Sequence, residues 1–462
     1  MTGRAILTAA GMRAAEEAAI AAGTPVGTLM DRAGSAAAEA ILRFAGTMPA
    51  LVLCGPGNNG GDGYVIARRL REAGADVRVA ALGSPKAGAA AAAAEAWGEG
   101  AEPLDSAAPA PLLIDALFGT GLARGLDEGV AARLAALAAA ARVRVAVDLP
   151  SGAATDDGRL LSPVPGCDLT VTFGALKPAH LLQPAARHMG RIVVADIGIA
   201  ADSRLFEISR PHLPEPGPDD HKYTRGYAAV LAGEMPGATA LTASAAARAG
   251  AGYVRLIAPA TVAGLPHAVV QSEGSARAQL ADGRIDAIAV GPGLGRSARA
   301  EALLDCALAA GPPLVLDADA LVLLAARGPD ALSALASVPI ITPHAGEFAR
   351  LWDGERGSKV DRARAAAAAW GAVIVFKGAD TVVAAPDGRA AIAPPASSWL
   401  ASAGTGDVLT GIVAAMRARG LDAFEAACAA VWLHARAALL AGPALIADDL
   451  VAALPAALAS CR

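Results

Sequence analysis

Short apolar runs alternate with longer, alanine-rich stretches along this chain of 462 residues. The runs cover residues 51–54, 77–82, 112–115, 143–148, 169–173 and 191–196 in the first half, and 227–233, 253–259, 287–291, 313–319, 339–343 and 373–378 in the second. Runs of this length are typical of buried strands, and strands that alternate with helical stretches predict a parallel sheet with helices on both faces. Pro386-Asp387-Gly388 lies between two further β-like runs and predicts a hairpin. The pattern therefore predicts an α/β fold.

The regular alternation stops between residues 200 and 220, where the chain reads "AADSRLFEISRPHLPEPGPDD". Prolines crowd the second half of this stretch and no apolar period is visible, as expected of a linker. The chain is also long for a single domain. We therefore expect two α/β domains, residues 1–208 and 213–462, with no obvious repeat between them.

Composition excludes several classes of protein. The net charge of −5 gives no broad basic surface for nucleic acid. The five cysteines are scattered without a C-x-x-C pair, which favours free thiols in a reducing compartment. We find no uninterrupted apolar stretch long enough for a membrane span, and Arg13, Glu16 and Glu17 lie too early for a signal peptide. We expect a cytoplasmic protein with no membrane or nucleic-acid partner, and a homo-oligomer because its alanine-rich faces are large.

The stretch "LVLCGPGNNGGDG" contains a possible dinucleotide-binding loop, because Gly55, Gly57 and Gly60 satisfy G-x-G-x-x-G after a strand. Two features oppose this interpretation. Asp62 would place a carboxylate beside the bound pyrophosphate, and Asp76 opens the following strand instead of closing it. A simple cofactor loop is therefore disfavoured, while a structural glycine-rich turn and a loop with a different ligand both stay open.

Oxygen-rich side chains follow three of the predicted strands, namely Asn58, Asn59 and Asp62; Asp115 with Gly119-Thr120-Gly121; and Asp148 with Ser151. The carboxyl ends of parallel strands meet at one edge of a sheet, so these groups can converge on one crevice. Asn59, Asp115 and Ser151 would supply carbonyl, carboxylate and hydroxyl oxygens, the ligands that hard cations prefer. Asp148 can move a proton if its pKa suits the task, although Asp is also a common helix N-cap.

The motifs "GPGNNGGDG", "DALFGTGL" and "DLPSG", preceded by "TLMDRAG", together resemble the N-terminal domain of NAD(P)HX epimerases, which act on hydrated NADH and NADPH. The resemblance covers residues 8–205 and implies a Rossmann-like three-layer α/β/α sandwich. It implies substrate contacts from Asn58, Asn59, Gly60, Gly61 and Asp62, and phosphate contacts from Gly119, Thr120, Gly121, Leu122, Ala123, Arg124 and Gly125. It also implies that Asp148 lies at the reacting ring and that Asn59, Asp115 and Ser151 bind a potassium ion.

A second motif lies near the C-terminus, where Gly404-Thr405-Gly406-Asp407 opens a stretch with the apolar period of a helix. Backbone N–H groups of such a turn at a helix N-terminus form an anion site. Asp407 could then act as base on an acceptor hydroxyl while the turn stabilises a transferring phosphoryl group. The alternative is an aspartate that only caps the helix.

This pattern resembles the ribokinase-like superfamily, and "GPGLG", "DADAL", "TPHAGEFARL" and "FKGADTVVA" narrow the resemblance to the ADP-dependent NAD(P)HX dehydratase, over residues 213–455. The resemblance implies a ribokinase-like α/β/α domain with Asp407 as base and magnesium on the nucleotide phosphates. It implies contacts to the hydrated dinucleotide from Ala238, Gly293 or Gly295, and His344, and contacts to ADP from Lys377, Gly378, Ala379, Asp380, Thr381 and Gly406. From the residues alone, His344 could instead cap a helix, and Lys377 could be a solvated charge at a strand end.

Together the two resemblances imply a bifunctional repair enzyme for hydrated NAD(P)H. One domain would interconvert R- and S-NADHX or NADPHX, and the other would dehydrate the S form with ADP, releasing AMP and phosphate. Two alternatives are a sugar or vitamin kinase and a non-enzymatic module like that of RNA-decapping scaffold proteins. "TPHAGEF" argues against the kinase, and Asp148 with the intact "NNGGD" argues against the module.

Overall fold

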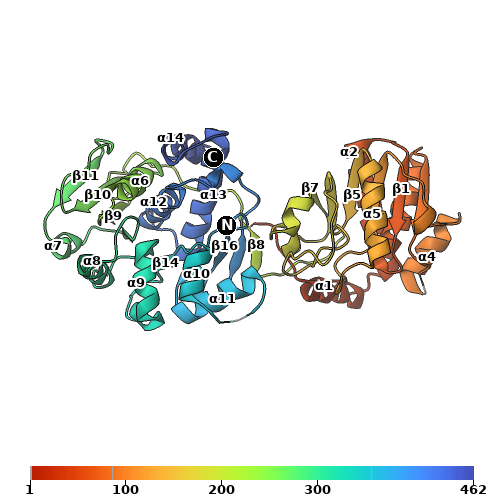
Figure 1. Ribbon diagram of the computed structural model, residues 1–462, viewed down its shortest axis with the longest axis horizontal. Coiled ribbons are helices and arrows are strands. Elements are labelled where there is room, and N and C mark those ends of the chain that lie inside the picture. The colour runs from red at the N-terminus through yellow and green to blue at the C-terminus, as the bar shows by residue number, and fades with distance from the viewer. Residues whose placement is uncertain (1–2, 86, 355, 462) are drawn as a thin grey trace. The chain divides into compact units, whose positions relative to one another are not determined.

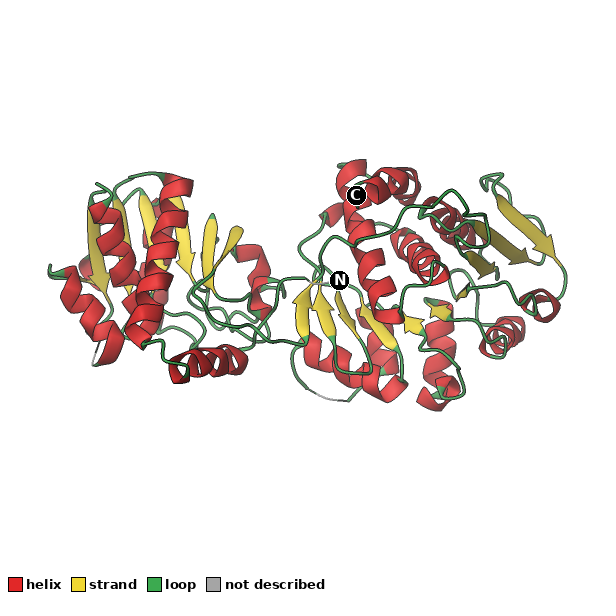
Figure 2. Cartoon of the chain, turned by 180° about the vertical axis from the view of Figure 1, so that it is seen from behind, coloured by secondary structure: helices red, strands yellow, loops and turns green. Residues whose placement is uncertain are grey.

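The computed structural model describes residues 3–85, 87–354 and 356–461. The chain forms two compact units. The N-terminal unit runs from Arg4 to Leu205, and the C-terminal unit runs from Phe206 onward and includes Gly3. In each unit a sheet is covered by helices (Figures 1 and 2). The α/β architecture predicted for both halves is therefore confirmed.

The sheet of the N-terminal unit has the order β3-β2-β1-β4-β5-β6-β7 in the described residues. Its strands are β1 (Ala50–Cys54), β2 (Val77–Ala81), β3 (Glu102–Pro103), β4 (Leu112–Ala116), β5 (Val143–Val147), β6 (Leu169–Phe173) and β7 (Arg191–Ala195). All neighbouring strands pair in parallel. The six apolar runs expected in this half are all strands, and only the very short β3 was not predicted.

Helices cover both faces of this sheet (Figure 1). They are α1 (Ala9–Ala21), α2 (Val26–Ala45), α3 (Asn58–Glu72), α4 (Gly88–Trp97) and α5 (Glu128–Ala140), with 3₁₀ turns η1 (Leu104–Ser106), η2 (Pro178–His180) and η3 (Ala185–His188). Alternate side chains of β1 point to opposite faces. Val52 packs with α2 and α3, whereas Leu51 and Leu53 pack with α5. The unit is thus the three-layer α/β/α sandwich predicted from the sequence.

The sheet of the C-terminal unit has the order β11-β10-β9-β12-β13-β14-β15-β16-β17-β8 in the described residues. Its strands are β8 (Leu205–Glu207), β9 (Tyr227–Leu231), β10 (Tyr253–Ala258), β11 (Val269–Glu273), β12 (Ala287–Val290), β13 (Leu314–Leu316), β14 (Ile340–Ile341), β15 (Val373–Phe376), β16 (Val382–Ala384) and β17 (Ala390–Ile392). Pairing is parallel from β11 to β15, and β16 and β17 form the antiparallel hairpin predicted around Asp387.

The helices of this unit are α6 (Pro236–Arg248), α7 (Ala276–Leu280), α8 (Ala298–Leu308), α9 (Asp319–Arg327), α10 (Ala345–Leu351), α11 (Lys359–Trp370), α12 (Thr405–Ala418), α13 (Ala423–Ala441) and α14 (Ala447–Ala459), with 3₁₀ turns η4 (Pro329–Leu332) and η5 (Ser398–Leu400). Helices α6, α12, α13 and α14 share one alanine-rich core with the sheet. Helix α13 is long and apolar enough to cross a membrane by length and composition, although Glu425, His434 and Arg436 interrupt its apolar run, as the sequence led us to expect. It is buried over 61% of that window, because it is a helix of this core.

The segment expected to be a linker, residues 200–220, is only partly irregular. Leu205 and Ile208 are 4% and 2% exposed, and the backbone N–H of Ile208 donates to the carbonyl oxygen of Ile392 at 2.8 Å. Strand β8 thereby extends the C-terminal sheet beyond β17. We expected no strand in residues 200–220, and this was wrong for Leu205–Glu207. Three residues are too few to show an apolar period in the sequence. Residues 209–220 contain no helix or strand.

The strand order of each sheet reverses at one place, between β1 and β4 and between β9 and β12. In open parallel sheets such a reversal opens a crevice at the carboxyl ends of the strands, where ligands bind. The polar motifs found in the sequence follow the carboxyl ends of β1, β4 and β5 in the N-terminal unit, and of β12, β13, β14 and β15 in the C-terminal unit.

Candidate active sites

The "NNGGD" motif forms the first turn of helix α3, which begins at Asn58 directly after the Gly57 N-cap. Gly60 and Gly61 serve the packing of this helix. A Cβ on Gly60 would lie 1.8 Å from the carbonyl oxygen of Gly55, and one on Gly61 would lie 2.6 Å from Met30 Cε. Neither glycine lines the cavity described next, although the resemblance implies substrate contacts from both.

A cavity of about 490 Å³ lies at the switch point of the N-terminal sheet. Of the sequence-predicted site residues, Asn58, Asn59, Asp62, Gly119, Thr120, Gly121, Leu122 and Asp148 line it. Gly119 is the point where the three loops meet, because a Cβ there would lie 2.7 Å from Asp148 Oδ2 and 2.8 Å from Asn59 Oδ1. Ala123, Arg124 and Gly125 are not among the lining residues, and Gly125 lies against the backbone of Leu161.

Asp148 is the most tightly held side chain of the cavity. Its backbone has a φ of 65°, a left-handed conformation that Asp adopts more readily than most residues. Its carboxylate accepts hydrogen bonds from Thr120 N at 2.8 Å and Thr172 Oγ1 at 2.9 Å, and pairs with Lys177 Nζ at 2.7 Å. No helix begins after Asp148, so the helix-cap alternative was wrong.

Burial alone would raise the pKa of Asp148, but the Lys177 ammonium and the hydrogen bonds from Lys177 and Thr120 hold it well below its usual range. The carboxylate is therefore ionised at neutral pH and is a poor proton carrier. From the sequence we expected Asp148 to move a proton only if its pKa suited that task. Its lowered pKa does not meet this condition. Asp148 can therefore present a fixed negative charge to a ligand at the cavity wall.

Two residues next to Asp148 were missed in the sequence. Lys177 is 1% exposed and also donates to Thr172 Oγ1 at 2.7 Å. His180 accepts a hydrogen bond at Nδ1 from the backbone N–H of Lys177, so its proton is on Nε2, which donates to the carbonyl oxygen of Asp148 at 2.8 Å. Both follow the carboxyl end of β6, and the same strand-end rule that singled out Asp148 could have found them in "ALKPAH".

Two further carboxyl groups line the cavity, Asp62 and Glu16 of α1. Burial raises the pKa of Asp62 well above its usual range, and the charges of Asp148 and Glu16 raise it further. Burial likewise raises the pKa of Glu16. Asp62 and Asp148 thus share one cavity, and their pKa values are shifted in opposite directions, the arrangement typical of acid and base chemistry.

The predicted cation ligands lie at the floor of the same three loops. Asp115 is 5% exposed and accepts hydrogen bonds from Ser151 Oγ at 2.7 Å and Ser151 N at 2.9 Å. Asn59 has a buried amide nitrogen without a hydrogen-bond partner among the described residues. Asp115 and Ser151 are in direct contact. Asn59 lies at the Gly119 turn, where its Oδ1 would be 2.8 Å from a Cβ on Gly119.

In the C-terminal unit the "GTGD" motif begins α12. Gly404 is the N-cap with a φ of 83°, and a Cβ there would lie 2.7 Å from Leu241 Cδ1 and 2.9 Å from Ala447 Cβ, so only glycine fits. No side chain caps this helix. The alternative that Asp407 merely caps it was therefore wrong, and its N–H groups are left for another acceptor.

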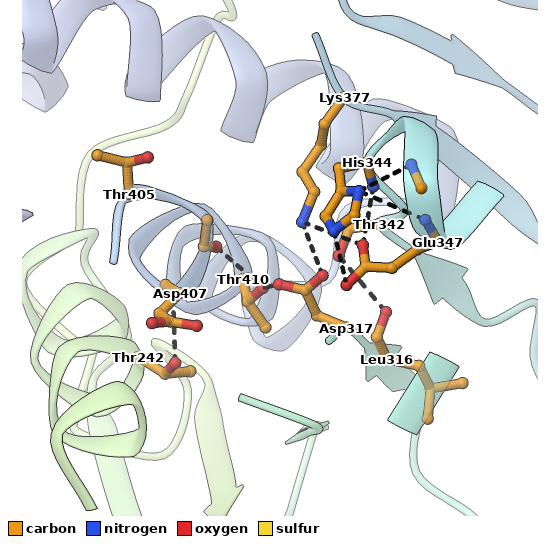
Figure 3. A network of polar contacts seen from close by, with 12 residues as sticks. Thr242, Leu316, Asp317, Thr342, His344, Glu347, Lys377, Thr405, Asp407 and Thr410 are labelled. Carbon is orange, nitrogen blue, oxygen red and sulfur yellow. Dashed lines mark hydrogen bonds and ion pairs between the residues drawn. The ribbon is translucent and has the colours of Figure 1, made fainter. Parts of the chain in front are cut away.

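Asp407 stands in the first turn of α12, with Thr410 one turn further on (Figure 3). Burial raises the pKa of Asp407 to about 6, with further increases from the charges of Asp317 and Glu347 and a decrease from Lys377. No hydrogen bond to its carboxylate is found within the described ranges, so the group is free to meet a ligand. A carboxylate with this pKa is well suited to act as a base near neutral pH.

Lys377 is mostly enclosed, with 18% of its side chain exposed, and is paired rather than solvated as the sequence allowed. Its ammonium donates to Asp317 Oδ1 at 2.8 Å and lies 4.0 Å from Glu347 Oε2. Asp317 also accepts from Thr410 Oγ1 at 2.6 Å (Figure 3). The sequence pointed to the "DADAL" motif. It could not show that Asp317 contacts Lys377 and Thr410, which lie 60 and 93 residues further along the chain.

His344 is the N-cap of α10, which confirms the alternative that this histidine caps a helix. Its Nδ1 accepts from Gly346 N at 2.9 Å, and Glu347 Oε2 accepts from His344 N at 2.8 Å. The side chain is 59% exposed, and its Nε2 lies 3.5 Å from Glu347 Oε1, so the ring caps the helix and stays open to solvent beside Glu347.

The other predicted dehydratase residues lie at the start of α6 and in turns of the C-terminal unit. Ala238 is in the first turn of α6. Gly293 accepts a hydrogen bond from Met235 N at 2.9 Å, and Gly295 N donates to Asp319 Oδ2 at 3.0 Å. In the expected nucleotide segment, residues 377–381, Asp380 pairs with Lys359 Nζ at 2.6 Å, and the Thr381 hydroxyl donates to the Gly378 carbonyl oxygen at 2.9 Å, which closes the turn.

Two family models match the chain in the order of its units. One is described as YjeF-related protein N-terminus and matches residues 26–179, and the other is described as NAD(P)H-hydrate dehydratase and matches residues 228–456. The bifunctional NAD(P)H-hydrate repair enzyme of Mycobacterium leprae is 37% identical over 441 residues, which cover 92% of this chain and 91% of the relative. That of Thermofilum pendens is 36% identical over 464 residues, which cover 90% and 88%.

A solved structure, the ADP/ATP-dependent NAD(P)H-hydrate dehydratase from Bacillus subtilis, is 33% identical with a TM-score of 0.48 and covers 55% of this chain and 96% of that chain. The fold is that of a two-unit α/β protein, with a polar cavity in the N-terminal unit and a cluster of polar side chains around Asp317 in the C-terminal unit. The identity to relatives over 91% and 88% of their length shows that the chain belongs to the bifunctional NAD(P)H-hydrate repair enzymes.

The chain therefore combines an NAD(P)H-hydrate epimerase, an isomerase, with an NAD(P)H-hydrate dehydratase, a lyase. Both resemblances found in the sequence are confirmed. Neither a sugar or vitamin kinase nor a module without activity is consistent with this family, so both alternatives are set aside.

Proposed function

We propose that the cavity of the N-terminal unit binds the hydrated nicotinamide ring of R- or S-NAD(P)HX beside Asp148 and inverts its configuration. The observation that carries the proposal is that two carboxyl groups, Asp148 and Asp62, line one cavity, and their surroundings shift their pKa values in opposite directions, down for Asp148 and up for Asp62. Asn58, Asn59 and the turn at Gly119 would contact the rest of the substrate.

In this mechanism the bond between the ring carbon and its hydroxyl oxygen breaks first. The electron pair leaves with the oxygen, which takes a proton from Asp62 and departs as water, while the ring nitrogen stabilises the cation with its lone pair. Water then adds to the other face of the ring and gives a proton back to Asp62. Asp148 stays ionised throughout, and its charge stabilises the cationic ring in the cavity.

A potassium ion held by Asn59, Asp115 and Ser151 is part of this proposal. Amide, carboxylate and hydroxyl oxygens suit a hard cation, and the orphaned amide nitrogen of Asn59 shows that its side chain is not fixed by hydrogen bonds among the described residues. The ion would supply positive charge below the cavity and tie the three loops together.

For the C-terminal unit we propose ADP-dependent dehydration of S-NAD(P)HX with Asp407 as base. Asp407 removes the proton of the ring hydroxyl, whose oxygen attacks the terminal phosphoryl group of ADP, and AMP leaves. The phosphate then departs with the electron pair of the carbon–oxygen bond and takes up the proton that leaves the neighbouring ring carbon, which restores the double bond of NAD(P)H. The uncapped N–H groups of α12 support this role, since they can stabilise the transferring group.

The remaining predicted contacts belong to the same proposal. Ala238, Gly293 or Gly295, and His344 would meet the hydrated dinucleotide, and residues 377–381 with Gly406 would meet ADP. Magnesium would neutralise the nucleotide phosphates. The described residues contain no group of three or more His, Cys, Asp or Glu side chains that could hold a metal ion. Because Mg²⁺ binds through phosphates, waters and only one or two carboxylates, the nucleotide would supply most of its ligands.

The proposal is tested by incubating the full chain with a mixture of R- and S-NADHX and following the near-ultraviolet absorbance of NADH. With ADP and magnesium we expect recovery of the whole mixture, and without a nucleotide we expect none. A parallel sample with ATP shows which nucleotide is preferred. Equal recovery with and without nucleotide would contradict the proposed dehydratase chemistry.

A further inference from the structure

Asp317 follows the carboxyl end of β13, and its side chain lies between Lys377 and helix α12 (Figure 3). The residue is 1% exposed. Its two oxygens accept hydrogen bonds from Lys377 Nζ at 2.8 Å and from Thr410 Oγ1 at 2.6 Å. Both oxygens are thus occupied within the protein, which sets Asp317 apart from Asp407, whose carboxylate is free to meet a ligand.

Lys377 lies close to the proposed base but is not paired with it. A Cβ on Gly406, the residue before Asp407, would lie 3.5 Å from Lys377 Nζ. Nevertheless the ammonium pairs with Asp317 and approaches Glu347, and no ion pair joins it to Asp407 among the residues that the structure describes. The cation nearest to the base is therefore held by another carboxylate.

We propose that Asp317 is a positioning residue of the dehydratase site: by holding Lys377 and Thr410, it keeps the ammonium away from Asp407 and leaves Asp407 free to take the proton of the substrate hydroxyl. This inference rests on the proposed role of Asp407 as base. It assigns a role to a residue that the reaction itself does not touch.

The charges around Asp407 support this role. Asp317 and Glu347 raise its pKa and Lys377 lowers it, in addition to the larger effect of burial. Loss of the Asp317 charge would therefore lower the pKa of Asp407 directly, and it would also free Lys377 to pair with Asp407, which lowers the pKa again.

Among the described residues, the charges that shift the pKa of Asp407 are those of Asp317, Lys377 and Glu347, while helices α6 and α13 place neutral groups beside it. Helix α6 contributes Thr242, whose hydroxyl donates to the backbone oxygen of Asp407 at 3.1 Å. Helix α13 contributes His434, whose Nε2 donates to the carbonyl oxygen of Thr405 at 2.9 Å. Burial lowers the pKa of His434 to about 4, so it is neutral where the enzyme works.

The test is the pH dependence of kcat/KM for S-NADHX with ADP in Asp317→Asn, measured on the full chain. The acidic limb is expected to move to lower pH by about one unit, the size of shift that nearby charges produce, and the plateau to fall because Lys377 then pairs with the base. A merely structural loss would lower the rate equally at every pH. Epimerase activity, measured in the same samples, is expected to stay at the parent level.

Asp319→Asn is the matched control, because it removes a charge from the same "DADAL" motif that pairs with Arg296 at 2.9 Å instead of Lys377. Its acidic limb is expected at the parent position, as is that of Asp317→Glu, which keeps the charge. Asp317→Ser removes the same charge with a smaller side chain if Asp317→Asn does not fold.

An acidic limb that stays in place in Asp317→Asn or Asp317→Ser would overturn the inference. So would an equal shift in Asp319→Asn. Asp407→Asn separates this inference from the proposed function. If Asp407→Asn kept full dehydratase activity, the proposed base would be wrong, whereas an inactive Asp407→Asn with an unmoved limb in Asp317→Asn would refute only the role of Asp317.

Discussion

Lys177 Nζ lies 2.7 Å from Asp148 Oδ1, and the two side chains are 1% and 9% exposed. Removing one partner of a buried pair leaves the other charge uncompensated, which costs about 3–5 kcal/mol. Lys177→Met should therefore lower the free energy of unfolding of the N-terminal unit by that amount, measured by urea unfolding. It should also abolish epimerisation, because Asp148 then gains a proton or turns away from the ring.

The dehydratase of the same chain is the internal control for this variant and should keep its parent rate on S-NADHX. A folded Lys177→Met that still epimerises at the parent rate would show that Asp148 does not need its partner.

A second prediction concerns the turn where the three epimerase loops meet. Gly119→Ala would place a Cβ 2.7 Å from Asp148 Oδ2 and 2.8 Å from Asn59 Oδ1, both shorter than real Cβ contacts. The carboxylate must then move, and epimerisation should fall by at least about tenfold, as misplaced catalytic groups commonly cause. Gly129→Ala is the control from the same unit, since a Cβ there meets nothing within 4 Å and the residue does not line the cavity.

Rates for both alanine variants can be read from the interconversion of R- and S-NADHX by chromatography. Equal rates for Gly119→Ala and Gly129→Ala would contradict the close approach of Asp148 and Asn59.

A third prediction follows from the pKa of Asp407, raised to about 6. A base acts only when deprotonated, so kcat/KM of the dehydratase should fall about tenfold per pH unit below that value and level off above it. The measurement is the rate of NADH recovery from S-NADHX with saturating ADP across this range. A profile without an acidic limb near pH 6 would mean that another group takes the proton.

A fourth prediction concerns the potassium site. A ligand that binds only the folded protein raises the free energy of unfolding, by about 2.7 kcal/mol at a hundredfold excess over its dissociation constant. Potassium should therefore raise the melting temperature of the N-terminal unit above that in an equal concentration of tetramethylammonium, and Ser151→Ala should remove the difference. The same melting temperature in both salts for the parent chain would argue against the site.

The strands and the crevice edges could be predicted from the sequence, because short apolar runs and the polar residues after them are local features. The helical start of "NNGGD" at Asn58 could not, since its glycines suggest a loop and only packing against Met30 and Gly55 explains them. Strand β8 could not be predicted for a different reason. It has only three residues, which are too few to show an apolar period, and it lies in a proline-rich segment.

Partners distant in sequence set the electrostatics of both sites, and no local pattern reveals them. The pKa of Asp148 depends on Lys177, which reaches it only because β6 lies beside β5. The pKa of Asp407 depends in part on Asp317, which lies 90 residues earlier in the chain. The candidate residues could therefore be named from motifs, but their protonation states required the fold.

The most direct test of two separate sites is a complementation experiment with Asp148→Asn and Asp407→Asn, given a mixture of R- and S-NADHX with ADP. Alone, Asp148→Asn should rapidly recover only the S fraction as NADH, and Asp407→Asn should recover none. Mixed in one tube, the two variants should recover the whole mixture, because each supplies the activity that the other lacks. Parent-like recovery by either variant alone, or a mixture that recovers no more than Asp148→Asn, would contradict the account.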